Sequence, residues 1–168
     1  MLALLPLAVF AGFLIVAACS DVATMKIPNW VSIALAALFP LAALVAGVPL
    51  ATIGWHVLFG VIVLAICFGM FQIGLMGGGD AKLIAAAAVW TGLGAFAPFA
   101  LWTVMTGGLI ALLLLFARAR IKPDEKRPAF LNRLLKPRGG VPYGVAIMCG
   151  GLAALPALPF PGAPLTLP

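Results

Sequence analysis

The sequence has few charged residues: only 8% of its 168 positions are Asp, Glu, Lys or Arg. A soluble domain carries about 25% charged residues, so this chain has too few to cover a surface that faces water. Disorder is excluded on the same ground. Three cysteines are also too few for a small secreted domain held by disulfides. Apolar residues are abundant instead, at 65% of the chain, and they predict an integral membrane protein.

Six apolar runs are candidates for membrane-spanning helices, which need about 20 apolar residues each. They cover residues 2–20, 30–47, 53–76, 83–97, 98–117 and 141–158. The fourth and fifth runs are continuous and together too long for one helix, and Gly92, Gly94 and Pro98 are candidates for the break. The sequence contains no strand pattern and no internal repeat. We therefore predict an all-α fold, with residues 1–168 forming a single membrane-embedded domain of six transmembrane helices.

The charged residues occur in three places: Asp21 with Lys26, Asp80 with Lys82, and residues 118–138. With six helices, all three places lie on one side of the membrane. The positive-inside rule assigns that side to the cytoplasm and both termini to the outer, periplasmic side. Residues 118–138 contain eight basic and two acidic residues, which accounts for the whole net charge of +6. We interpret this excess as an orientation signal and a contact with the anionic inner leaflet, with no nucleic-acid partner.

The basic loop, residues 118–140, contains a short amphipathic pattern. Its apolar residues recur at helical spacing around two basic ones: Phe130, Leu131, Leu134 and Leu135, with Arg133 and Lys136. This pattern is typical of a short helix that lies on a membrane surface. Anchoring to the membrane and docking of a substrate are both compatible with it.

The N-terminal apolar run has two interpretations. Val16 to Cys19 matches the loose pattern of a lipoprotein signal, with Cys19 as the acylated residue. A secretory signal starts with a basic segment, however, and no Lys or Arg precedes Lys26. We therefore predict an uncleaved first helix.

Two of the four acidic residues stand at the ends of predicted helices: Asp21 after the first, and Asp80 before the fourth. Each aspartate can simply cap a helix. Their shared side of the membrane suggests a second role, because two close carboxylates in a poorly solvated site share a proton. One can then take a proton from an attacking water, while the other polarises a peptide carbonyl and protonates the leaving amine. The pair titrates as a unit, so the sequence does not assign the two roles.

The sequence gives little support for a histidine-based catalytic site or for a metal site. His56 is the only histidine and is predicted near the opposite face, and the three cysteines lack the spacing of metal ligands. We therefore expect no metal and no cofactor. The glycines before Asp80 (Gly77, Gly78 and Gly79) permit backbone conformations that other residues do not adopt, and close approach of a substrate.

Three segments together resemble one protein family, the type IV prepilin peptidases, which are membrane aspartyl proteases. Gly77-Gly78-Gly79-Asp80-Ala81-Lys82 fits the GxGD-x-K motif of that family. Asp21, followed at fixed spacing by Ile-Pro28-Asn29, is similar to its other aspartate motif. Val141-Pro142-Tyr143-Gly144 resembles its third recurring segment, at the start of the last helix.

The resemblance implies a function. It implies removal of a short basic leader from a prepilin or pseudopilin precursor at the cytoplasmic face of the bacterial inner membrane, with Asp21 and Asp80 as the catalytic pair. The active-site support then comes from the rest of the motifs: Gly77, Gly78, Gly79, Lys82, Lys26, Pro28, Asn29, Pro142, Tyr143 and Gly144. The larger members also N-methylate the product and carry CxxC pairs, which this chain lacks, so we expect no methylation. Its compactness is similar to the short enzymes of tight-adherence (Flp) pilus systems and to archaeal preflagellin peptidases, and of these we favour the bacterial Flp form.

Several assignments have alternatives at this stage. Lys26 and Lys82 tune the aspartates by charge or anchor the chain at the membrane surface. Asn29 hydrogen-bonds a carboxyl group or caps the second helix. The alanines at 85–88 pack the bundle or permit close approach of a substrate helix. A small cation-coupled transporter and a non-catalytic pilus-assembly component are the alternative functions, and no oligomeric state is predicted.

Overall fold

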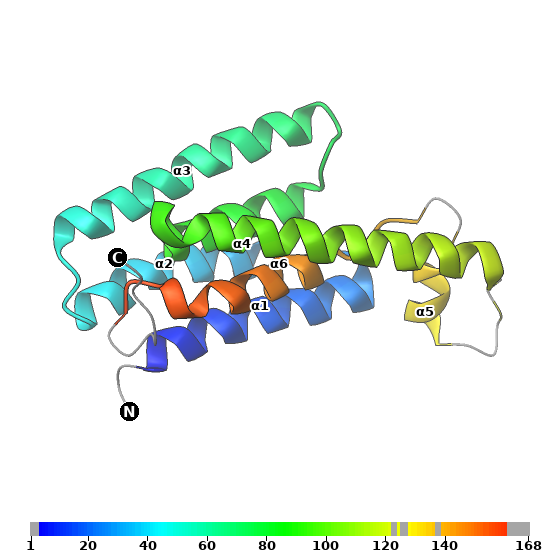
Figure 1. Cartoon of the computed structure of the whole chain (residues 1–168), viewed down its shortest axis with the longest axis horizontal. Coiled ribbons are helices and arrows are strands. Elements are labelled where there is room, and N and C mark those ends of the chain that lie inside the picture. Colours follow the sequence, from blue (N-terminus) through cyan, green and yellow to red (C-terminus); the bar gives the residue numbers. More distant parts are fainter. Residues whose placement is uncertain (1–3, 122–123, 125–127, 137–138, 161–168) are drawn as a thin grey trace.

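The computed structural model describes residues 4–121, 124, 128–136 and 139–160, and these residues form helices and connecting turns, without a strand. The helices are α1 (Leu5–Thr24), α2 (Asn29–Val45), α3 (Leu50–Gln72), α4 (Gly78–Arg120), α5 (Ala129–Leu134) and α6 (Tyr143–Ala154), which continues into the 3₁₀ turn η2 (Leu155–Ala157). The predicted all-α fold is therefore confirmed for the described part of the chain. Figure 1 shows the long helices lying side by side, with α5 at one end of the bundle.

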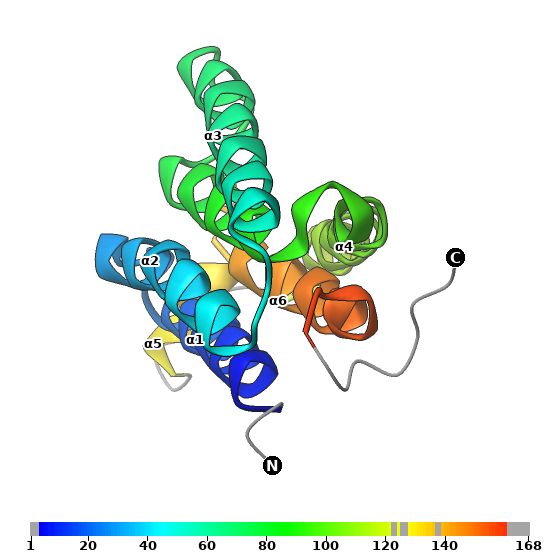
Figure 2. The ribbon, with the colours of Figure 1, turned by 90° about the vertical axis from the view of Figure 1, so that its left-hand side faces the viewer.

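The helix α4 consists of two segments that fold back on each other at Gly92. Gly92 has φ +57° and ψ −170°, which is not helical and which only glycine adopts readily. Asp80 and Val104 line the same cavity, whereas 24 residues of straight helix would separate them by about 36 Å. Figure 1 shows the second segment running back along the bundle, and in the end view of Figure 2 the two segments lie on opposite sides of α6.

A histidine occupies the space at this reversal. A Cβ atom on Gly92 would lie 2.5 Å from Cε1 of His56, so a larger residue does not fit. The ring stacks on Phe39 with centroids 5.0 Å apart, and its Nδ1 lies 2.9 Å from the carbonyl oxygen of Val89. Helix interruption leaves backbone carbonyl groups without helical partners. We conclude that His56 fills and stabilises the turn.

Several predicted boundaries are wrong. The break expected between residues 97 and 98 is at Gly92, and Pro98 lies inside the second segment without ending it. The fourth helix begins at Gly78 rather than at residue 83, and the first ends at Thr24 rather than at residue 20. The apolar runs stop at the first charged residue, whereas helical hydrogen bonding continues for another turn at the membrane surface. Asp21 and Asp80 therefore lie within the terminal turns of α1 and α4, and not just outside these helices as predicted.

Three helices (α1, α3 and α4) are long and apolar enough to cross a membrane, and α2 and α6 are shorter apolar helices. The six spans and the periplasmic termini remain predictions. The end of α1, the start of α4 and the end of its second segment carry charged residues, and all lie at the same end of the bundle as α5 (Figure 1). This clustering agrees with the expectation that the charges share one side.

Small residues let α6 pack deep in the bundle. A Cβ atom on Gly151 would lie 2.1 Å from Leu14 on α1, and one on Gly150 would lie 2.0 Å from Oγ1 of Thr103 on α4. Such contacts are typical of helices that associate in membranes. The alanines at 85–88 are also buried, which shows that they pack the bundle.

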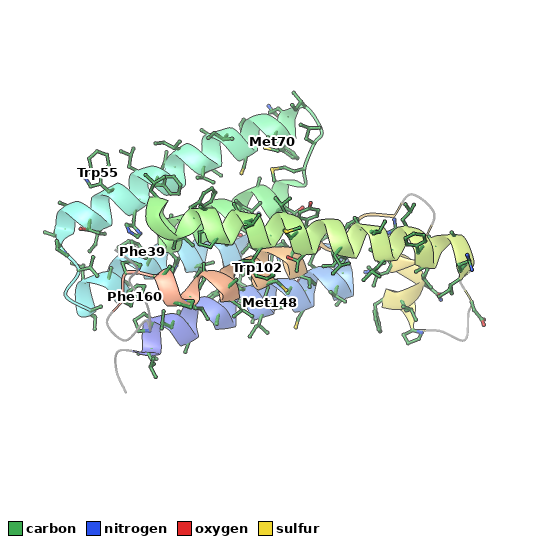
Figure 3. The ribbon with its side chains drawn as sticks, in the orientation of Figure 1. Phe39, Trp55, Met70, Trp102, Met148 and Phe160 are labelled. Atoms are coloured by element: carbon green, nitrogen blue, oxygen red, sulfur yellow. The ribbon has the colours of Figure 1, made fainter. Side chains whose placement is uncertain are left out.

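An aromatic cluster holds the bundle at the end opposite to α5 (Figure 3). Trp90 is fully buried, and its Nε1 donates a 2.7 Å hydrogen bond to the carbonyl oxygen of Leu35. Phe10, Phe39 and Phe160 surround it with ring centroids 5.3 to 5.7 Å away. This packed end fixes the helices whose other ends carry the aspartates.

Candidate active site

Asp21 lies in the last turn of α1 and is buried, with 5% of its surface exposed. Its Oδ2 accepts a 2.7 Å hydrogen bond from the backbone N–H of Gly144, near the start of α6. A Cβ atom on residue 144 would lie 2.9 Å from the Cβ of Asp21, so only glycine permits this approach. Pro142, which is buried and precedes α6, directs the chain into that helix. The third motif segment therefore holds the first aspartate.

A tight turn follows Asp21. Met25 adopts a left-handed conformation, with φ +56°, and its N–H donates a 2.7 Å hydrogen bond to the carbonyl oxygen of Asp21. The hydroxyl of Ser20 donates to the carbonyl oxygen of Lys26 at 2.9 Å. Pro28 is extended and stands at the N-cap of α2 without a side-chain cap. The turn thus directs the chain from α1 into α2 beside the carboxyl group.

Asp80 is the third residue of α4, and its carboxyl group lies close to Gly77, the N-cap residue: a Cβ atom on Gly77 would lie 2.8 Å from Oδ2 of Asp80. This is the position from which an acidic side chain reaches back toward the N-cap in a capping box. The start of a helix also stabilises a negative charge. The position of Asp80 therefore agrees with the capping role that the sequence allowed.

The three glycines before Asp80 provide space and not unusual backbone angles. Positive φ among the described glycines occurs only at Gly47, Gly74 and Gly92, so the expected special conformations are wrong. A Cβ atom on Gly79 would lie 3.3 Å from the Cβ of Ile27, and one on Gly78 would lie 3.3 Å from the ring of Phe71. The two aspartate motifs thus pack directly against each other where Gly79 meets Ile27.

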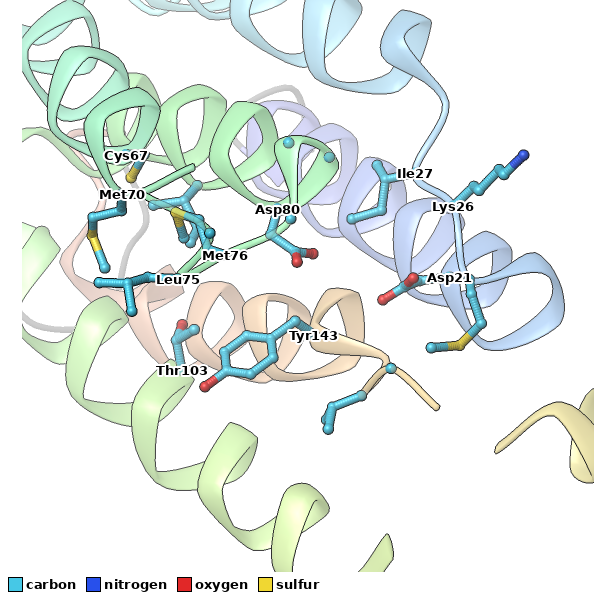
Figure 4. Close-up of a pocket in the computed structure, with 18 of the residues that line it drawn as sticks. Asp21, Lys26, Ile27, Cys67, Met70, Leu75, Met76, Asp80, Thr103 and Tyr143 are labelled. Carbon is cyan, nitrogen blue, oxygen red and sulfur yellow. The ribbon is translucent and has the colours of Figure 1, made fainter. Parts of the chain in front are cut away.

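Both carboxyl groups face one cavity of about 1050 Å³. Figure 4 shows Asp80 from α4 and Asp21 from α1 pointing into the same space. The two carboxylates are close enough for their charges to interact. The arrangement can therefore divide acid and base roles between two neighbouring oxygen acids.

Asn29 and Lys82 join the two motifs by another contact. The ammonium group of Lys82 donates a 2.9 Å hydrogen bond to Oδ1 of Asn29, between α4 and the start of α2. Asn29 therefore neither caps α2 nor bonds a carboxyl group, the two roles considered from the sequence. Lys26 is exposed and lines the cavity that contains both aspartates.

Tyr143 forms the floor of the cavity between α6 and the second segment of α4. Its ring packs on Gly107, where a Cβ atom would lie 2.9 Å from the ring and 3.0 Å from the hydroxyl oxygen. In Figure 4 its hydroxyl group points toward Thr103, away from the backbone of α6. Gly107 is a site residue that the sequence did not identify, because a lone glycine in an apolar run carries no signal.

Two arginines hold α5 as a wall of the cavity. The Arg118 guanidinium donates from Nε to the carbonyl oxygen of Leu134 at 2.8 Å and from Nη2 to that of Gly140 at 2.7 Å. Arg133 donates to the carbonyl oxygen of Ala23, two residues after Asp21, at 2.7 Å. The segment between α4 and α6 is therefore fastened to both aspartate-bearing helices.

The amphipathic pattern of this segment is only partly a membrane-facing surface. Leu135 is 4% exposed and packs inside the protein, while Phe130 is 43% exposed. Arg133 and Lys136 line the cavity with the aspartates, which their positions in a basic run did not reveal. The predicted contact of residues 118–138 with anionic lipid stays a prediction, and residues 122–123, 125–127 and 137–138 lie outside the described part.

Comparison with known proteins gives one match. The model of the type IV leader peptidase family matches residues 8–112, which include both aspartates and run from α1 into the second segment of α4. Neither the curated proteins nor the solved structures contain a significant match.

Proposed function

Because the chain belongs to the type IV leader peptidase family, we propose that it is an aspartic membrane protease whose catalytic pair is Asp21 and Asp80. The observation that carries this proposal is the meeting of the two carboxyl groups at one cavity. The substrate is a prepilin or pseudopilin precursor, from which the enzyme removes the leader.

The pair supports a water-based hydrolysis. The ionised carboxylate takes a proton from water, whose oxygen attacks the peptide carbonyl carbon, while the protonated carboxyl group donates to the carbonyl oxygen. Collapse of the tetrahedral intermediate breaks the C–N bond, and a proton passes to the leaving amine. The products are a leader with a new carboxylate and a pilin with a new amine. The Gly144 amide holds Oδ2 of Asp21, which leaves its other oxygen for water or substrate.

The catalytic pair is tested by isosteric substitution. Asp21→Asn and Asp80→Asn should each abolish leader removal from a co-expressed precursor, followed by its shift on a gel. Asp124→Asn, which changes an acidic residue that does not line the cavity, is the matched control and should leave cleavage intact. Full cleavage by either active-site variant contradicts the assignment.

We also propose the location and the product of the reaction. The clustering of charges at the aspartate end supports action at the cytoplasmic face of the bacterial inner membrane, in the manner of the short enzymes of Flp systems. The chain has no pair of cysteines at CxxC spacing, which supports cleavage without N-methylation. Mass spectrometry of the mature pilin should therefore find an unmodified N-terminal amine, and a methylated product refutes this part.

A further inference from the structure

The cavity at the aspartates has two chemically different ends. One end lies between α3 and the second segment of α4 and is mainly apolar, lined by Cys67, Met70, Leu75 and Val104. The other lies between the end of α1 and α5 and is lined by three cations, Lys26, Arg133 and Lys136. Figure 4 shows Cys67, Met70 and Leu75 on one side of Asp80, with Asp21 and Lys26 on the other. The carboxyl groups stand between the two ends.

The apolar end is open toward the region that lipid occupies. Val104 is 65% exposed and Met70 is 38% exposed, although both line the cavity. α3 and the second segment of α4 contact each other near the reversal, where the rings of Phe59 and Phe96 have centroids 5.1 Å apart. Closer to Asp80 the cavity separates them, so Met70 and Val104 line the walls of a gap. An apolar helix can lie in such a gap without leaving the bilayer.

The cationic end suits a polar, extended segment. Lys and Arg side chains are hydrogen-bond donors only, so they match the carbonyl oxygens of an extended backbone. Arg133 is already held by the carbonyl oxygen of Ala23, which fixes it beside Asp21. Because like charges repel, a basic leader would contact these cations through its backbone, with its own basic side chains directed toward water.

From this polarity we infer how the substrate lies in the site, an inference that rests on the proposed function. The apolar segment that follows the scissile bond occupies the gap between α3 and the second segment of α4. The leader crosses the opposite end, between the turn after α1 and α5. The scissile bond lies between Asp21 and Asp80. The residues that distinguish the two halves of the precursor are Met70 and Val104 on one side and Arg133 and Lys136 on the other.

A second apolar groove is an alternative place for the substrate helix and supplies a control position. It has a volume of about 460 Å³ and lies between α2, α3 and the first segment of α4, lined by Ile33, Val61, Ala86 and other apolar residues. Neither aspartate lines it. A substrate helix in this groove would lie on the other face of α4, so Ile33, which is 66% exposed, is a suitable control position.

Disulfide cross-linking tests the arrangement. The full chain is made without its three native cysteines, and its cleavage of a co-expressed precursor is measured first. Asp80→Asn is then added so that the precursor stays intact. Val104→Cys, Lys136→Cys or Ile33→Cys is combined with a precursor that has one cysteine, either in its leader or early in its apolar segment. Cross-linked product is measured on gels after oxidation.

We expect a specific pattern of cross-links. Val104→Cys should join the apolar segment and Lys136→Cys the leader, each severalfold more than the reverse pairing, and Ile33→Cys should join neither. A reversed pattern or cross-linking from Ile33→Cys overturns the inference. So does the absence of any cross-link from Val104→Cys and Lys136→Cys when the cysteine-free parent enzyme cleaves normally. Failure of that enzyme and of the unmodified chain to cleave any precursor instead counts against the proposed function.

Discussion

At the scale of single residues, the hydrogen bond between Gly144 and Asp21 holds the carboxyl group of the first aspartate. It connects the last helix to the first and leaves no room for a side chain. The sequence identified Gly144 only through a family motif. Its physical role depends on the distance between two helices, which the spacing of residues along the chain does not contain.

Gly144→Ala should lower the cleavage rate at least about tenfold, because weakening a hydrogen bond to a charged group costs about 1.5–3 kcal/mol. The methyl group would lie 2.9 Å from the Cβ of Asp21 and push the two helices apart. Initial rates of precursor cleavage measure the effect. Gly108→Ala, where a Cβ atom meets nothing within 4 Å, is the control and should cleave at the normal rate. Equal rates for both variants contradict the role of Gly144.

The bond between Lys82 and Asn29 should couple the two residues energetically by about 0.5–1 kcal/mol, the range for an exposed pair with one charge. Thermal unfolding in detergent of Lys82→Met, Asn29→Ala and the double variant measures this coupling. Strictly additive effects of the two substitutions would show that the bond does not stabilise the protein.

At the scale of elements, the reversal at Gly92 determines the shape of the site, because it brings the second segment of α4 back beside Asp80. The sequence predicted a break and included Gly92 among its candidates, but composition alone does not show which candidate forms the break. Gly94 and Pro98 carry equally strong signals. The choice between them depends on where the His56 ring lies, and this is a contact between helices.

Gly92→Ala should destabilise the protein by several kcal/mol, about 1–3 from backbone strain and about 1–3 from overpacking against His56. Thermal unfolding in detergent is the measurement. Gly94→Ala should leave the Tm unchanged or raise it, since Gly94 is helical and a Cβ atom there meets nothing within 4 Å. A Tm for Gly92→Ala as high as that of Gly94→Ala would contradict our account of the turn.

The position of α5 depends on Arg118. Arg118→Met removes the two hydrogen bonds to Leu134 and Gly140, so chymotrypsin should cut at Phe130 faster than in the unchanged protein. Arg120→Met, which changes an exposed neighbour, should be cut at the original rate. Identical digestion of both variants would show that Arg118 does not hold the wall of the cavity.

At the scale of the whole molecule, composition predicted helices apolar enough to cross a membrane, which the described residues contain, and charge placement predicted the topology, which stays a prediction. An apolar content of 65% requires lipid as the solvent, and the few charges mark one end. The arrangement of helices was not predictable in the same way. The composition of the helices does not show that α6 lies between α1 and the second segment of α4. Glycines permit this packing, but other glycines of the chain occupy exposed positions, so a glycine in the sequence does not identify a helix contact.

Cysteine labelling should find the two ends of the bundle on opposite sides of the membrane. In a chain without native cysteines, Leu50→Cys should react with a membrane-impermeant maleimide applied from the periplasmic side. Lys136→Cys should react only after the inner membrane is opened. The physical reason is the confinement of the charges to the end that contains Lys136. Reaction of both positions from one side refutes the topology.

The bond between Asp21 and Gly144 also has a consequence for biosynthesis, because its two residues are 123 positions apart in the chain. Asp21 is synthesised with α1, and its partner is synthesised only with α6. Until then this carboxyl group lacks the amide that orients it. Under the proposed function, we therefore expect leader removal to reach its full rate only after α6 has been inserted beside α1.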